Sequence, residues 1–380
     1  MITRHDLKEL LSRKPQANDP VLSLYLNVDQ GRSVNLNRGF EAAFRSLVQG
    51  AERGLNENGQ RRNFQDAVKA AAAFLEDYEP AAKTLVMFCN AAGDFRWHRG
   101  ISVGMDNCLR WSWRPFVRPL VEIRDEYQRY GVILTDRAKA RLFTVFLGSV
   151  QEREAAFANA DVHRFDGPGM DQLRSQMNLQ RKADEHARQH LRNVAELMDR
   201  IATNERFDRL VLGGTSEITS ELRSLLSERL KKMYVGSVSL PVDASPAAIL
   251  EETLKLQREE ERRRERELVE TLVTAAAKNH QAVTGWKHTV EAAVAGRIRQ
   301  LVYSEGIEMK GSECPACDLL SGSELTACPT CSGPVVPVDD LANALVSRVV
   351  LEGGEVEELK EDAAEEFRQR AGGIGAFLRF

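Results

Sequence analysis

Two Cys-x-x-Cys pairs constrain this chain more than any other feature. Cys314-Pro-Ala-Cys317 and Cys328-Pro-Thr-Cys331 are separated by ten residues. Matched knuckles at this spacing are typical of four thiolates around one tetrahedral zinc ion, and four protein ligands leave no open position for catalysis. Two disulfides or a redox pair are alternatives, but neither requires two matched knuckles. We therefore predict one structural zinc ion in a small helix-free ribbon over residues 312–334.

The bulk properties exclude several classes of protein. The 380 residues carry a net charge of −4, so contact with nucleic acid has to come from local basic patches, and we expect no DNA partner. No apolar run approaches the roughly 18 residues of a membrane span, and the first residues lack the apolar core of a signal peptide. Cysteine usage fits a reducing compartment. We therefore expect a cytoplasmic protein with no membrane partner.

The alternation of apolar strands and amphipathic helices predicts a mixed α/β (α+β) chain of three domains. In the first domain, strands are expected at 21–28 and 84–89. In the second, a hairpin at 130–136 and 140–147 precedes a long helix at 172–201, a strand at 207–212 and a helix at 217–232. The third opens with a highly charged helix at 251–270, and another helix is expected at 290–300. The predicted boundaries are 1–127, 128–244 and 245–380.

Several segments resemble the archaeal and eukaryotic class I release factors and Pelota. The closing Gly372-Gly-Ile-Gly-Ala-Phe-Leu-Arg-Phe380 is similar to the end of their last domain, where a glycine-rich turn leads into the final strand. Thr284-Gly-Trp-Lys-His-Thr-Val-Glu-Ala-Ala-Val-Ala-Gly296 resembles another segment of that domain. In the middle domain, Leu191–Glu196 and Phe207–Thr215 resemble the helix after the catalytic loop and the following strand. The resemblance implies a zinc ribbon inserted in the third domain, as the cysteines suggest.

The chain departs from this family at the loop that carries catalysis. The release factors have Gly-Gly-Gln before the long helix, and its glutamine places a water against the peptidyl-tRNA ester. This sequence has no Gly-Gly-Gln, and the matching loop reads Asp166-Gly-Pro-Gly-Met-Asp-Gln172. Pro168 fixes φ where a flexible residue would be expected. The expected peptidyl-transferase-centre loop comprises His163, Arg164, Gly167, Pro168, Gly169, Met170 and Gln172.

The altered loop favours a bacterial member of the family that occupies the ribosomal A site without hydrolysis, and such relatives include a ribosome hibernation factor. On this interpretation the protein is a translation regulator of the stress response and not an enzyme. Two alternatives stay open: peptidyl-tRNA hydrolysis with Gln172 as the fallback catalytic residue of a Gly-x-x-Gln variant, and Pelota-like ribosome rescue. The resemblance implies the ribosome, through its 16S and 23S RNA, and elongation factor Tu or a related translational GTPase as partners.

Ribosomal RNA contacts should come from cations that meet phosphates. On the long helix the candidates are Arg174, Arg181, Lys182, Arg188 and Arg192, although a solvated helix face is the alternative. The stop-codon motif Asn-Ile-Lys-Ser is missing, and its place is expected in the loop before Phe40. The expected decoding-centre loop residues are Arg32, Ser33, Asn35, Asn37 and Arg38.

Other groups carry weaker signals. Trp97, Trp111 and Trp113 could stack on bases, but core packing is favoured. Gly213-Gly214 resembles a weak phosphate-binding turn without being a Walker motif, so we expect no nucleotide site. His163, Asp166 and Asp171 have no nucleophile or metal partner for acid–base chemistry.

Overall fold

The computed structural model describes residues 4–12, 19–55, 58–126, 128–146, 149–153, 174–204 and 207–380. Their contacts form two compact units. One unit contains residues 1–123 together with 265–380, and the other contains residues 124–264. The predicted first and third domains thus share one unit, and the division at residues 127 and 244 stays a prediction. No described helix is long and apolar enough to cross a membrane.

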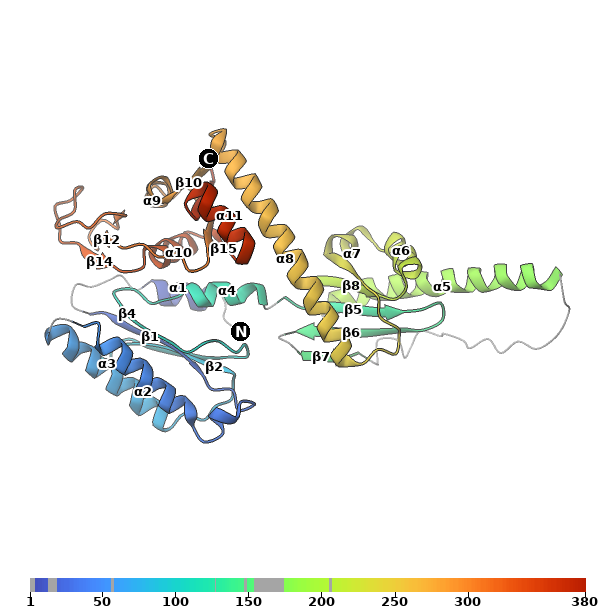
Figure 1. Ribbon diagram of the computed structural model, residues 1–380, viewed down its shortest axis with the longest axis horizontal. Coiled ribbons are helices and arrows are strands. Elements are labelled where there is room, and N and C mark those ends of the chain that lie inside the picture. Colours follow the sequence, from blue (N-terminus) through green and yellow to red (C-terminus); the bar gives the residue numbers. More distant parts are fainter. Residues whose placement is uncertain are drawn as a thin grey trace. The chain divides into compact units, whose positions relative to one another are not determined.

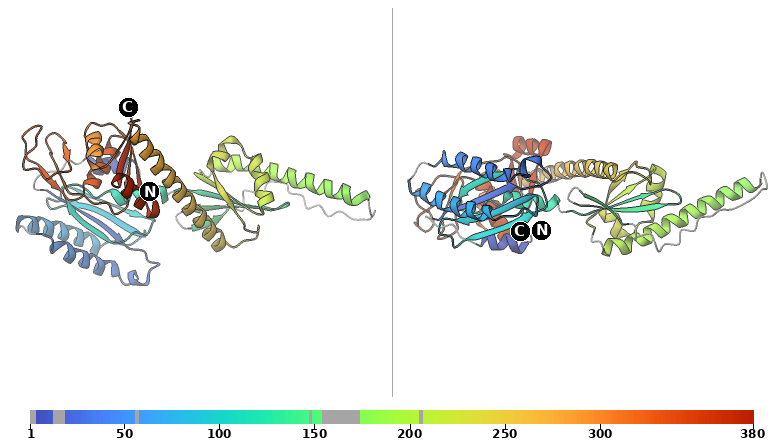
Figure 2. Two further views of the ribbon diagram at one scale, coloured as in Figure 1. Left: turned by 45° about the horizontal axis from the view of Figure 1, so that its top comes forward. Right: turned by 90° about the horizontal axis from the view of Figure 1, so that it is seen from below.

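The amino-terminal part of the first unit is an antiparallel sheet with the strand order β3-β2-β1-β4. Its elements are α1 (Arg4–Leu11), β1 (Val21–Asn27), η1 (Ser33–Asn35), α2 (Gly39–Glu52), α3 (Asn58–Glu76), β2 (Thr84–Asn90), β3 (Arg96–Ile101), β4 (Cys108–Ser112) and α4 (Arg118–Glu126). The strands predicted at 21–28 and 84–89 are β1 and β2. Helices α2 and α3 lie side by side on one face of this sheet (Figure 1, Figure 2). Leu22, Leu24 and Leu26 point to that face because side chains alternate along a strand.

The carboxyl-terminal part of the first unit contains two sheets. Its elements are α8 (Pro246–Ala277), β10 (Ala282–Thr284), α9 (Trp286–Val294), β11 (Ile298–Ser304), β12 (Gly311–Glu313), β13 (Leu320–Ser321), β14 (Val336–Val338), α10 (Leu341–Leu351), β15 (Glu355–Leu359), α11 (Glu361–Ala371) and β16 (Ile374–Leu378). The larger sheet has the order β10-β16-β11-β15, and the smaller has the order β13-β12-β14. Helix α8 belongs to this part only from residue 265 onward. Gly372 and Gly373 both have positive φ in the turn before β16, as the glycine-rich ending predicts.

Asn343 on α10 joins the two parts of the first unit. Its Oδ1 accepts a hydrogen bond of 2.9 Å from the backbone N–H of Val117, and its Nδ2 donates one of 3.0 Å to the carbonyl of Pro115. The side chain is 5% exposed. These bonds satisfy buried backbone groups at the start of α4 and tie that helix to α10.

The second unit is a mixed sheet with the order β7-β6-β5-β8-β9. Its elements are β5 (Tyr130–Thr135), β6 (Ala140–Phe146), β7 (Ser149–Glu152), α5 (Arg174–Asn204), β8 (Arg209–Gly213), α6 (Ser216–Leu225), α7 (Glu228–Met233), β9 (Tyr234–Val238) and the first part of α8. The predicted hairpin is β5 paired with β6, and β5 also pairs in parallel with β8. Leu191, Val194 and Met198 of α5 pack on one face, and Ile249 of α8 packs on the other. Apolar cover on both faces explains the continuous apolar sequence of β5.

Two predicted helices are corrected. The helix expected over 217–232 is two helices, α6 and α7, because the hydroxyl of Ser227 accepts a hydrogen bond from the Leu230 N–H and starts a new helix. The helix expected over 290–300 ends at Val294. Gly296, with φ of 66°, turns the chain, and residues from Ile298 onward form β11. In both places one residue interrupts the apolar pattern, since Ser227 starts a new helix and Gly296 turns the chain after one.

Candidate metal centre and nucleic-acid contact residues

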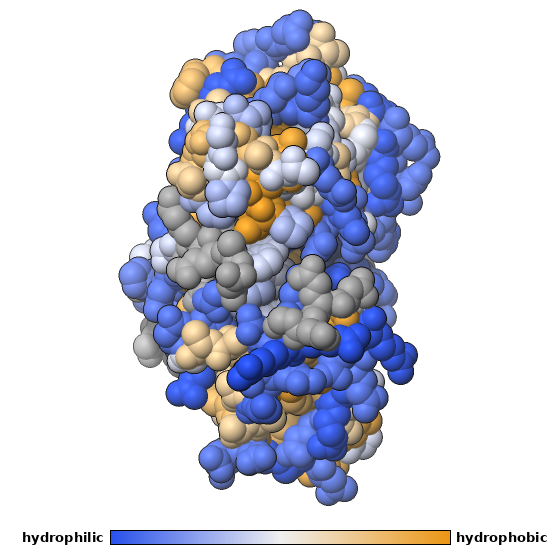
Figure 3. Space-filling view, turned by 90° about the vertical axis from the view of Figure 1, so that its left-hand side faces the viewer, coloured by the Kyte–Doolittle hydropathy of each residue, from blue (hydrophilic) through white to orange (hydrophobic). Residues whose placement is uncertain are grey.

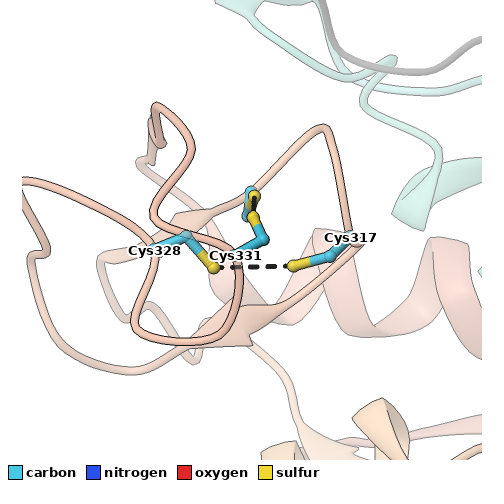
Figure 4. A group of neighbouring side chains, drawn as sticks. Cys317, Cys328 and Cys331 are labelled. Atoms are coloured by element: carbon cyan, nitrogen blue, oxygen red, sulfur yellow. Dashed lines mark hydrogen bonds between the residues drawn. The ribbon is translucent and has the colours of Figure 1, made fainter.

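The four cysteines of the two knuckles form one cluster. Their Sγ atoms all lie within 4.8 Å of one another. The Sγ atoms of Cys314 and Cys331 are 3.4 Å apart, and those of Cys317 and Cys328 are 3.5 Å apart (Figure 4). Zinc–sulfur bonds of about 2.3 Å place tetrahedral thiolates about 3.8 Å apart, whereas a disulfide bond is about 2.0 Å long. The cluster therefore fits a metal ion, and all six cysteines of the chain are free of disulfides.

The two knuckles repeat one backbone design. The N–H of Cys314 donates to the carbonyl of Leu319, and its carbonyl accepts from the N–H of Asp318, at 2.9 and 2.8 Å. Cys328 makes the equivalent bonds to Gly333 and Ser332, both at 2.9 Å. Asp318 and Ser332, at matching positions, both have φ of 57°. This repeat turns each Cys-x-x-Cys pair so that its two sulfurs face the same point.

The backbone around Cys328 favours a thiolate at that position. Burial raises the pKa of the Cys328 thiol, but hydrogen bonds from the backbone N–H groups of Cys331 and Thr330 outweigh burial and bring the pKa to about 6. Backbone N–H groups also lower the pKa values of Cys317 and Cys331, but hydrogen bonds with the neighbouring cysteines raise both on balance, so the cluster favours ionisation at Cys328 first. A Cβ at Gly333 would lie 3.3 Å from Cys331 Sγ, so glycine keeps that side open. The four cysteines predicted as ligands thus lie together in the fold, and the identity of the metal ion as zinc stays a prediction.

The expected peptidyl-transferase-centre loop lies outside the described residues. This applies to His163, Arg164, Gly167, Pro168, Gly169, Met170 and Gln172. Helix α5 begins directly after this segment, at Arg174, as the resemblance implies. The roles expected for the loop residues stay predictions.

The five cations expected to contact RNA all lie on α5. The side chains of Arg174, Arg181 and Lys182 are outside the description. Arg188 and Arg192 are exposed, and they form surface ion pairs with Glu221 at 3.2 Å and with Glu185 at 3.8 Å. Exposed pairs of this kind contribute at most about 1 kcal/mol, so phosphates can displace the carboxylates. These two arginines therefore remain suitable for RNA contact.

Two residues of the expected decoding-centre loop have structural roles. Asn35 is 5% exposed, and its Nδ2 donates to the carbonyls of Asn27 and Asp29, both at 3.2 Å. Arg38 donates to the carbonyl of Leu75 in the last turn of α3 and, at 3.2 Å, to that of Tyr78 just after the helix, and it pairs with Glu41. Only Arg32, Ser33 and Asn37 of the expected set are exposed. The set as a whole stays a prediction.

Sequence reasoning missed the most exposed side chains of this loop. Val34 is 72% exposed and Leu36 is 63% exposed. Asn35 lies between these two residues, and its hydrogen bonds hold the turn while both aliphatic side chains face solvent. The signal in the sequence was two aliphatic residues alternating with polar ones in a segment too short for a strand.

Trp97, Trp111 and the glycine turn have structural roles. Trp97 is 7% exposed, and the ring of Trp111 packs edge-on against Phe64 with a centroid distance of 5.5 Å. A Cβ at Gly213 would lie 2.2 Å from Leu134 Cδ2, so a side chain there would displace Leu134 of β5. The hydroxyl of Thr215 caps α6 by accepting from the Ile218 N–H. The turn is thus a strand-to-helix connection, as the sequence argument favoured.

Residues 115–258 match the family described as bacterial archaeo-eukaryotic release factor family 10. The matched segment, residues 115–258, therefore belongs to the bacterial archaeo-eukaryotic release factor family. The matched residues include β5 to β9 and α5, where the middle-domain resemblance was found in the sequence.

Known proteins similar to this chain include release factors and Pelota. Peptide chain release factor subunit 1 of Thermococcus onnurineus is 27% identical over 195 residues, which cover 45% of this chain and 47% of that protein. The match thus spans about half the length of that relative. The crystal structure of Archaeoglobus fulgidus Pelota is 15% identical, with a TM-score of 0.34, over 100% of this chain and 92% of that one. Saccharomyces cerevisiae Dom34, a translation termination-like factor, is 13% identical, with a TM-score of 0.42, over 82% and 78%.

Proposed function

We propose that this protein is a translation factor that occupies the ribosomal A site of idle cytoplasmic ribosomes without hydrolysing peptidyl-tRNA. The observation that carries the proposal is the family match over residues 115–258. The sequence supports the inactive form of the function, because Gly-Gly-Gln occurs nowhere in the chain and Pro168 stands within the corresponding loop. In these features the protein resembles the ribosome hibernation factor Balon.

RNA contact in this proposal comes from α5. Arg188 and Arg192 are exposed and only weakly paired, and more cations precede them on the same helix. Because each phosphate contact releases counterions, binding should weaken steeply with salt. Elongation factor Tu, or a related GTPase, is the proposed delivery partner, and one zinc ion in the cysteine cluster is the proposed cofactor.

The deciding experiment is cryo-electron microscopy of vacant bacterial ribosomes with the purified protein added. Density in the A site supports the proposal, and its absence there contradicts it. Affinity should fall at least about ten-fold in Arg188→Glu/Arg192→Glu, because two phosphate contacts become repulsive. Lys231→Glu/Lys232→Glu, on α7 of the same unit, is the charge-matched control and should bind like the wild type.

Peptidyl-tRNA hydrolysis is the second candidate, since Gln172 preserves a Gly-x-x-Gln sequence from Gly169. A release assay on ribosomes carrying peptidyl-tRNA separates the two functions. If the wild type releases the peptide and Gln172→Ala abolishes this release, the function is hydrolysis and not hibernation. Separation of the ribosomal subunits in a sucrose gradient, without release, would identify a Pelota-like rescue factor instead.

A further inference from the structure

A cavity of about 410 Å³ lies in the first unit, between β4 and the base of the cysteine ribbon. One wall is formed by residues 109–114 and by Leu55 after α2, and the facing wall includes residues 337–340. Figure 3 shows that this end of the molecule carries a recessed apolar patch among hydrophilic side chains. The volume lies in the range of specific ligand pockets, about 300–1,000 Å³.

The cavity runs along the edge of β4 and not against one of its faces. Side chains alternate between the two faces of a strand, so a cavity on one face would touch every second residue. Here consecutive residues from Leu109 to Arg114 all line the cavity. The strand order β3-β2-β1-β4 places β4 at the edge of its sheet. Within the described residues, no further strand pairs with it.

The facing wall supplies side chains and not a second hydrogen-bonding edge. Strand β14 is also at the edge of its sheet, but Pro337 at its centre has no N–H to donate. Val338 follows Pro337 in the lining and is half-buried. On the β4 side, Trp113 is half-buried in the same lining. The cavity thus combines one open backbone edge with apolar and aromatic walls.

The charges of the lining disfavour nucleic acid. Three cations and four carboxylates line the cavity. Arg114 forms a bidentate pair with Glu313, whose side chain is only 1% exposed, and Arg110 lies 3.7 Å from Glu308. A phosphate would meet more carboxylates than cations, and the Arg114 guanidinium is already held by the buried Glu313. An extended peptide needs backbone partners and an apolar pocket instead, which this edge offers.

We propose that β4 and this cavity bind an extended segment of a partner protein, which adds as a strand to β4 and inserts a bulky apolar side chain between Trp113 and Val338. Of the lining residues, Phe116 alone lies in the matched family segment, and the site does not depend on ribosome binding. A strand added to β4 satisfies the open edge, and alternate side chains then point into the cavity.

The test uses a displayed library of random peptides of about twelve residues, long enough to run past both ends of β4. Peptides selected for binding to the full chain are labelled with a fluorophore, and their affinity for the protein is measured by fluorescence anisotropy. Val338→Asp places a charge in the apolar wall and should weaken their binding at least about ten-fold. Val34→Asp is the matched control, because Val34 is 72% exposed on a loop outside the lining, and it should change binding by less than about two-fold.

Two further measurements keep the result interpretable. Val338→Thr nearly preserves the shape of valine, so it should weaken binding by about three-fold even if Val338→Asp disturbs the ribbon. Hydrogen exchange should show that bound peptide protects the amides of residues 108–112. The proposal is overturned if no selected peptide loses affinity in Val338→Asp or Val338→Thr, or if bound peptide protects amides outside residues 108–112. It is also overturned if an oligo-uridine probe loses affinity in these variants and the peptides do not.

Discussion

The guanidinium carbon of Arg118 lies 4.8 Å from the centroid of the Tyr303 ring. Arg118 begins α4, whereas Tyr303 lies on β11, so the contact joins segments that are far apart in the sequence. The same guanidinium pairs with Asp340 at 3.2 Å and with Glu358 at 3.3 Å, and its side chain is 7% exposed. Arg118 is therefore the charged centre of the junction within the first unit.

Replacing Arg118 with methionine should destabilise the first unit by about 3–5 kcal/mol, because the carboxylate of Glu358 would stay buried without its partner. The free energy of unfolding in urea, followed by tryptophan fluorescence, measures the effect. Adding Glu358→Gln should recover part of the loss, since no buried charge then remains unpaired at that position. The exposed pair Arg110–Glu308 provides the control, and Arg110→Ala should cost less than about 1 kcal/mol. Equal losses for Arg118 and Arg110 would contradict this assignment.

The cysteine cluster should bind one metal ion per chain. Cys317→Ser removes one of four ligands and should abolish stoichiometric metal, because structural zinc binding contributes on the order of 10 kcal/mol to such modules. Elemental analysis measures the ion and identifies it, and hydrogen exchange should increase over residues 311–338 while exchange in the sheets β3-β2-β1-β4 and β7-β6-β5-β8-β9 is unchanged. Cys108→Ser, outside the cluster, should keep the full metal content. Retention of the ion by Cys317→Ser would rule out the four-cysteine site.

The second unit should lose stability in mild acid through His190. Burial lowers the pKa of His190 below its ordinary 6.5, although the Lys139 carbonyl and Asp136 oppose the shift. The folded state then binds fewer protons than the unfolded state, so stability is complete above pH 6.5 and falls as the pH drops toward the folded pKa. The urea midpoint at pH 8 and pH 5 measures this loss.

His190→Gln should reduce the difference between the two midpoints. His186→Gln should leave it unchanged, because His186 is exposed on the same helix. A pH dependence that survives in His190→Gln would assign the effect to another group.

Two glycines of α2 should respond to alanine with opposite signs. A Cβ at Gly39 would lie 1.9 Å from the Val34 carbonyl oxygen, so Gly39→Ala should displace the loop and cost about 1–3 kcal/mol. Nothing lies within 4 Å of a Cβ at Gly50, and alanine there should stabilise the helix by about 0.5–1 kcal/mol. Thermal unfolding compares the two variants, and destabilisation by both would refute the steric argument.

The sequence was most informative where the pattern is local. Hydrogen-bonded knuckles and buried strands depend on neighbouring residues, so the cysteine cluster, β1, β2 and the hairpin of β5 and β6 could be predicted from spacing and alternation. The predicted helices were wrong at Ser227, which caps a new helix, and at Gly296, which turns the chain, because periodicity does not register a single cap or turn.

The sequence by itself thus determined the four-cysteine ligand set, the mixed α/β class and the family resemblance, since these rest on short-range spacing and recurring segments. Only the tertiary structure decided which polar residues are engaged. Asn35 and Arg38 look like free loop residues in sequence, but partners up to 40 positions away hold them. The partners of Arg118, more than 180 residues distant, and the open edge of β4 arise only when separate segments pack together.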